Sequence, residues 1–168
     1  TEWNKEYSGK IQYFSNEHEN LAYTAIQIFK KNILVGSGIK TFYYSCSELK
    51  IQKKVSAIDS GNFNLSSNKL QCSTHPHNYY LQILSDTGIF IFIYVFLFFL
   101  FIFVKNLKFI FKKNLNKIKL CFYFLNLGII INLFPFLPSG NFYNNWLSLI
   151  MFYPLGFWLY INQKVKDV

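Results

Sequence analysis

The stretch that decides the fold is Ile89-Phe-Ile-Phe-Ile-Tyr-Val-Phe-Leu-Phe-Phe-Leu-Phe-Ile-Phe-Val104, a run of sixteen consecutive apolar or aromatic side chains. A helix needs about 20 residues to cross a hydrocarbon core of roughly 30 Å. We therefore expect this helix to extend backwards through Gly88 and Asp86, and to span a membrane over about residues 85–104.

A polar tract lies immediately before this run and reads Cys72-Ser-Thr-His75-Pro-His77-Asn78-Tyr-Tyr-Leu-Gln82. The span places it at the membrane surface, where titratable groups are functional-site candidates by default. Asn78 is a good N-cap, and the helix N-terminus behind it predicts an anion site suited to pyrophosphate. His77 would act as a general base, and Gln82 would contact a sugar hydroxyl. The alternative is a set of plain interfacial polar residues.

Two more apolar stretches follow, and we expect them to form spans over about 120–137 and 146–161. The loop between the first and second spans is cytoplasmic by the positive-inside rule. It holds Lys105, Lys108, Lys112, Lys113, Lys117 and Lys119. The tail, 164–168, carries two more lysines and would lie on the same side. Three spans within 86–163 would then place residues 1–85 on the other side of the membrane.

Residues 1–85 are mixed in composition and mostly polar. Apolar residues at helical spacing predict an amphipathic helix over about 19–32, lying on the membrane or packed within a small domain. Residues 45–74 have the Ser-, Asn- and Lys-rich composition of a long loop. In an oxidising compartment, a disulfide between Cys46 and Cys72 would close this loop and contribute roughly 3 kcal/mol. The alternative is two unpaired thiols.

The net charge of +9 comes from 17 basic residues, all of which are lysine. Nucleic-acid readers rely heavily on the rigid fork of arginine. Because the lysines cluster beside apolar stretches, membrane topology explains them better, and we expect no nucleic-acid partner. We also expect no metal, since His75 and His77 supply too few ligands for a zinc site.

The run from Thr74 to Gly88, entering a span, resembles the signature of the O-antigen ligase and polymerase family. The upstream segment Ile28–Phe42, with its Gly36-Ser-Gly38 turn, is similar to a Gly-x-Gly segment of the same family. Members are polytopic glycan transferases with a large periplasmic loop near the C-terminus. The resemblance implies that this chain is a C-terminal part of such a protein. It would be an all-α protein of the bacterial inner membrane, with a periplasmic loop domain of short helices followed by three transmembrane helices.

The resemblance also implies a reaction. An O-antigen ligase transfers a glycan from undecaprenyl pyrophosphate to a sugar hydroxyl of lipid A–core, whereas a polymerase transfers it to another glycan. His77 would be the catalytic residue, and His75, Asn78, Gln82 and Lys40 would bind substrate. Family members hold the pyrophosphate with arginines, a role that Lys40 or Lys30 would take here. No cofactor is implied, and the expected partners are the lipid-linked donor, the acceptor and membrane lipids.

A rival from another class is a non-enzymatic membrane module, such as part of a polysaccharide exporter. It would need a continuous polar path through the spans, for which Asn126 and Asn132 are the candidates. Transport by such a module would survive the loss of both histidines.

Overall fold

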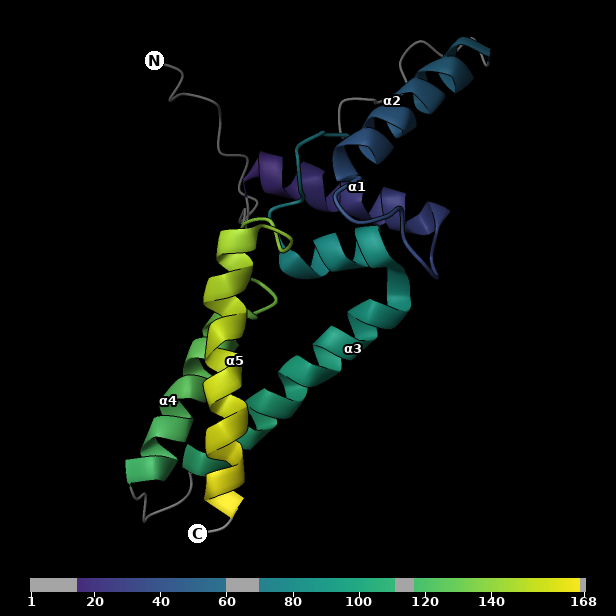
Figure 1. Ribbon diagram of the computed structural model, residues 1–168. Helices are drawn as coiled ribbons and strands as arrows, with labels where there is room; N and C mark the ends of the chain where they lie inside the picture. The colour runs from purple at the N-terminus through teal and green to yellow at the C-terminus, as the bar shows by residue number, and fades with distance from the viewer. Residues whose placement is uncertain (1–14, 60–69, 111–116, 167–168) are drawn as a thin grey trace, which may run out of the picture.

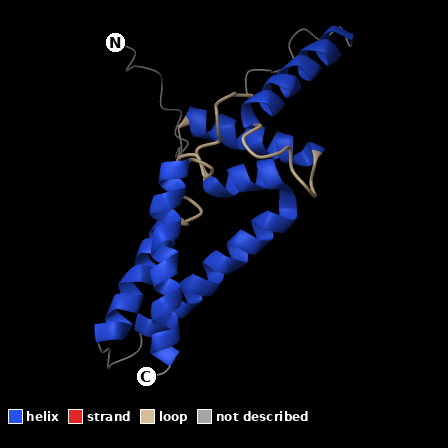
Figure 2. Ribbon diagram, viewed as in Figure 1, coloured by secondary structure: helices blue, strands red, loops and turns tan. Residues whose placement is uncertain are grey.

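The computed structural model describes residues 15–59, 70–110 and 117–166, and these residues form helices joined by loops, with no strand among them (Figure 2). In chain order the helices are α1 (Asn16–Lys31), α2 (Phe42–Asp59), α3 (Tyr79–Ile110), α4 (Lys117–Asn132) and α5 (Asn145–Lys166). Figure 1 shows α1, α2 and the start of α3 gathered at one end, with the rest of α3 running away from them toward the far ends of α4 and α5. The all-helical expectation is confirmed for the described residues.

Helix α1 has the sequence features of a well-bounded amphipathic helix. Ser15 caps it by accepting a hydrogen bond from the His18 backbone, acidic residues fill its first turn and Lys30 and Lys31 its last. Leu21, Ala25 and Ile28 form its buried stripe. The helix expected over 19–32 is therefore present and begins three residues earlier, at Asn16.

The long loop expected over 45–74 is wrong in its first part, because residues 42–59 form α2. Phe42, Cys46 and Leu49 are spaced by four and three residues, which puts them on one helix face. All three are buried with the apolar stripe of α1 and with Leu70. The polar composition of this segment belongs to the other face of α2. Residues 60–69 lie outside the described residues.

Helix α3 is not the straight span expected over 85–104. It begins at Tyr79, ends at Ile110, and is broken at Gly88, whose φ of 79° and ψ of −171° are not helical. That conformation is essentially restricted to glycine. Beyond the break, the helical segment that holds the apolar run continues to Ile110. The segment before Gly88 runs in another direction and packs under α1 (Figure 1).

The loop between α1 and α2, residues 32–41 and hereafter the kink loop, supplies the hydrogen bonds that the break in α3 removes. The backbone N–H groups of Ser37 and Gly38 donate to the carbonyls of Ser85 and Asp86, each at 2.9 Å. On the other side of the break, the N–H of Ile89 donates to the carbonyl of Ile33, also at 2.9 Å. Unpaired backbone groups are costly away from water, so the kink loop is what allows α3 to bend here.

Helices α4 and α5 also differ in their bounds from the spans expected over 120–137 and 146–161. Helix α4 ends at Asn132, because Pro135 disfavours helical backbone in the residue before it. Helix α5 continues to Lys166, so residues 164–166 are helical rather than part of a tail. Among the described residues, α3 over Tyr79–Lys108 is the one helix long and apolar enough to cross a membrane, judged by length and composition alone.

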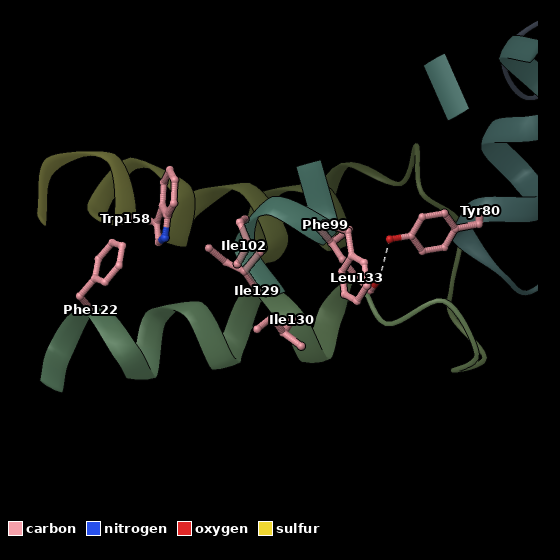
Figure 3. Packing of buried hydrophobic residues seen from close by; sticks show 8 residues of the cluster. All are labelled: Tyr80, Phe99, Ile102, Phe122, Ile129, Ile130, Leu133 and Trp158. Atoms are coloured by element: carbon pink, nitrogen blue, oxygen red, sulfur yellow. Dashed lines mark hydrogen bonds between the residues drawn. The ribbon is translucent and has the colours of Figure 1, made fainter. Parts of the chain in front are cut away.

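The second half of α3 packs with α4 and α5 around an aromatic-rich cluster, hereafter the bundle cluster (Figure 3). Trp158 of α5 stacks on Phe122 of α4 and donates to the buried Asn126 Oδ1 at 2.6 Å. At the other end of the cluster, the Tyr80 hydroxyl donates to the Leu133 carbonyl at 2.7 Å. This last bond ties the segment before the break in α3 to the chain that leaves α4.

Candidate functional site

A cavity of about 390 Å³ lies in the elbow of the kinked helix α3. Its walls come from both sides of the break, from α1, and from the loop after α4, and most of the lining is apolar. The lining includes Ala22, Pro76, Tyr80, Leu81, Leu84, Phe92, Pro135, Phe136 and Pro138. The polar residues of the lining are His18, Glu19, His77 and Asn78. The cavity volume falls within the range of about 300–1,000 Å³ that is usual for small-molecule sites.

Three histidines gather beside this cavity. The ring centroids of His75 and His77 are 4.2 Å apart, and those of His18 and His77 are 5.9 Å apart. His18 comes from the first turn of α1 and its Nδ1 lies 2.7 Å from the Ser15 hydroxyl. His18 was not among the site residues predicted from the sequence. The helical spacing could have indicated it, because His18 precedes Leu21 by three residues and Ala25 by seven and so lies on the buried face of α1.

His77 holds an unusual backbone conformation, with φ of 55°. A residue other than glycine in the left-handed region carries strain, and such residues cluster at functional sites. The conformation is held in place by the Ser139 N–H, which donates to the His77 carbonyl at 2.9 Å. The loop after α4 therefore fixes the position from which the His77 imidazole enters the cavity lining.

Asn78 is the N-cap of α3, as the sequence predicted. Its Oδ1 accepts from the N–H groups of Tyr80 and Leu81 at 3.0 and 3.1 Å, and its Nδ2 donates to the Pro135 carbonyl at 2.7 Å. The side chain of Asn78 therefore takes up two of the N–H groups that the expected anion site at this helix N-terminus would use.

Gln82 does not take the position expected for a sugar contact. It is fully buried; its Nε2 donates to Asn141 Oδ1 at 2.9 Å and its Oε1 accepts from the Phe142 N–H at 2.8 Å. Both amide atoms are thus used to hold the loop before α5 against α3. The structure gives Gln82 a positioning role in place of the expected substrate contact.

Lys40 does not lie at the histidines. Its backbone N–H donates to Asp86 Oδ2 at 3.3 Å, and its side chain is exposed. Asp86 stands seven residues after Tyr79, the first residue of α3, so a helical rise of about 1.5 Å per residue places it roughly 10 Å along the helix from the end that carries the histidines. The structure therefore places Lys40 at the break in α3, outside the lining of the cavity.

Asp86 is the polar residue at the break that the sequence left unexplained. It is 1% exposed, and it accepts from the backbone of Lys40 and from the hydroxyl of Ser85. A backbone N–H and a hydroxyl therefore take the place of water around this carboxylate. Nearby, burial and the charge of Asp86 raise the pKa of Tyr143 to about 12.

His75 is half-buried beside His77. Its Nδ1 lies 2.9 Å from the Thr74 hydroxyl, and its Nε2 is buried without a hydrogen-bond partner among the described residues. Burial, followed by the charge that His77 can carry, lowers the pKa of His75 below its ordinary value of 6.5. The neutral imidazole is therefore the favoured form of His75 in the folded protein.

The two cysteines that flank the segment 47–71 form a disulfide, with Cys46 and Cys72 Cα atoms 5.6 Å apart. The bond ties α2 to the chain just before the histidines. Cys121, the free cysteine of α4, is exposed. Within the ranges that the structure describes, no three His, Cys, Asp or Glu side chains, the three histidines included, are arranged so that they could hold a metal ion.

Comparisons of the chain with protein-family models, with curated proteins and with solved structures found no match in any of the three.

Proposed function

We propose that this chain forms the donor-binding and transfer site of an O-antigen ligase-like glycosyltransferase in the bacterial inner membrane. The observation that supports this most is the elbow cavity, which is apolar over most of its lining and meets histidines at one side. A lipid-linked sugar needs this combination, because its carrier is apolar and its reacting end is polar. The cavity would hold the head end of an undecaprenyl carrier, and the remainder of the tail would lie among membrane lipids.

In the proposed reaction, a hydroxyl of the lipid A–core acceptor attacks the anomeric carbon of the donor glycan. The new C–O bond forms as the bond from that carbon to pyrophosphate breaks, and the pyrophosphate leaves with the bonding electrons. The imidazole of His77 takes the proton of the attacking hydroxyl. His75, held neutral by its surroundings, would accept a hydrogen bond from the acceptor or donor. Pyrophosphate is a good leaving group, so the scheme invokes no cofactor.

The rival readings make different predictions. A polymerase of the same family would use the same site with another glycan as acceptor, and the product separates the two. A polysaccharide exporter needs a polar path through the spans, whereas each of its two candidate residues makes a hydrogen bond within the helices. Asn126 accepts from Trp158, and Asn132 donates to the Gly128 carbonyl within α4 at 2.8 Å. Transfer at the histidines is therefore the better-supported proposal.

The experiment replaces His77 in the complete gene product and follows lipopolysaccharide in cells that lack their own ligase. Asparagine is the most informative replacement, because it tolerates the left-handed backbone that His77 adopts and so removes the imidazole without disturbing the backbone. His77→Asn should abolish attachment of O-antigen to lipid A–core while the protein remains in the membrane at its normal level. Lys54→Ala, an exposed change on α2, is the matched control and should leave attachment intact.

Unchanged attachment by His77→Asn would discard the proposal. Loss of chain length with attachment preserved would assign the polymerase reaction instead of the ligase reaction. Export that persists in variants lacking both His75 and His77 would favour the non-enzymatic module.

A further inference from the structure

The kink loop exposes an unusual number of large aliphatic side chains. Ile33, Leu34, Val35 and Ile39 are 51%, 59%, 75% and 60% exposed. Single exposed apolar residues are ordinary, but a group of four on one short loop marks an interaction surface. The backbone of this loop is fixed by its hydrogen bonds to α3, so these side chains are held outward by a rigid support.

The position of the kink loop identifies the surroundings of these side chains. Ile33 bonds to Ile89, the first residue of the apolar run, and the backbone of Leu34 and Val35 touches Gly88. The run itself faces outward from its first turn, with Phe90 65% exposed and Ile91 49% exposed. The exposed aliphatic side chains of the kink loop therefore lie next to the exposed apolar side chains of α3. The two groups meet at the break in α3, where the apolar run begins.

The polar residues in and beside the kink loop are of the types that are found at a membrane surface. Lys30, just before the loop, and Lys40, near the end of the loop, are exposed, and Tyr43 and Tyr44 follow at 51% and 74% exposure. Lysine and tyrosine side chains are enriched where lipid headgroups meet water, and lysines attract anionic headgroups. A bilayer offers acyl chains for the four aliphatic residues and anionic headgroups for the lysines.

We propose that the kink loop inserts Ile33, Leu34, Val35 and Ile39 into the acyl region of the leaflet that surrounds the break in α3. The occupant of this surface is thus lipid, with Lys30 and Lys40 at the anionic headgroups. The insertion would fix the depth of the break in α3, and residues on both sides of that break line the elbow cavity. The inference rests on α3 crossing the membrane and not on glycan transfer.

The test measures depth with a fluorophore. Val35→Cys, made in a Cys121→Ser background, is labelled with a nitrobenzoxadiazole maleimide, and the chain is placed in nanodiscs of phosphatidylcholine with some phosphatidylglycerol. Lipids brominated on their acyl chains near the headgroup then serve as the quencher. Lys50→Cys on α2, also exposed, is the matched control. Neither site takes part in the proposed chemistry, so the result does not depend on activity.

Quenching of the label at residue 35 should be several-fold stronger than at residue 50, and its emission should shift to the blue. Equal and weak quenching at the two sites, with the label at residue 35 open to aqueous iodide, would overturn the proposal. A blue-shifted label that brominated lipid does not quench would also overturn it, because protein would then cover the loop.

Discussion

Gly88 lies so close to Leu34 that a Cβ at Gly88 would overlap the Leu34 carbonyl and approach the Val35 nitrogen to 2.7 Å. This contact joins the middle of α3 to a loop more than fifty residues earlier in the sequence. It is reciprocal, because a Cβ at Gly36 would in turn overlap the backbone of Asp86. The elbow of α3, and with it the cavity, therefore depends on backbone surfaces that only glycine leaves open.

Gly88→Ala should destabilise the protein by more than about 2 kcal/mol. The φ of 79° and ψ of −171° alone cost a residue other than glycine about 1–3 kcal/mol, and the overlap with Leu34 adds to that cost. Thermal unfolding in detergent, followed by circular dichroism, measures the loss. Gly128→Ala is the control, because Gly128 is helical and open, and it should be neutral or gain about 0.5–1 kcal/mol. Equal melting temperatures for the two variants would contradict the role given to the contact.

Loss of the Cys46–Cys72 disulfide should cost roughly 3 kcal/mol, because the bond closes a loop with a sequence separation of 26 residues. Cys46→Ser with Cys72→Ser should lower the melting temperature, and a reducing agent should do the same to the unaltered chain. Cys121→Ser, which removes the free thiol on α4, is the control and should change little. A melting temperature indifferent to reductant would show that the bond does not contribute.

Asn78 has two separable roles, and two variants distinguish them. Asn78→Ala removes both the cap of α3 and the bond to the Pro135 carbonyl, and should cost about 1–2 kcal/mol. Asn78→Ser keeps a capping oxygen but has no amide to reach Pro135, so it should lower the free energy of unfolding by less than Asn78→Ala does. Urea unfolding in mild detergent would resolve the two. Equal losses would mean that the cap itself contributes nothing.

The sequence predicted the helices that carry a strong apolar signal, α1 and the long run of α3, and it predicted the Asn78 cap. It could not predict the break at Gly88, since one glycine before an apolar run is compatible with a straight helix until a partner loop is known. Helix α2 was missed because its stripe of Phe42, Cys46 and Leu49 is short and surrounded by serine and lysine. The contacts of Gln82 and Lys40 could not be predicted for a related reason. A glutamine or a lysine can make many different contacts, and only the fold determines which of them forms.

His75 should make the stability of the protein depend on pH in a predictable direction. Its pKa in the folded protein lies below 6.5, so between that lowered pKa and 6.5 the unfolded chain binds more protons than the folded one. The free energy of unfolding should therefore rise with pH through this window and level off above it. As the pH falls through the window, the His75 contribution should be lost.

The measurement is the melting temperature from about pH 8 to about pH 5, compared between the unaltered chain and His75→Gln. Glutamine cannot be protonated in this range, so the variant should lose less stability on acidification than the unaltered chain. Because His77, His18 and Asp86 are present in both proteins, the difference between the two curves reports His75 together with its coupling to His77. Parallel curves would show that His75 is as easily protonated in the folded protein as in the unfolded one, and that the neutral acceptor invoked for the site is not favoured.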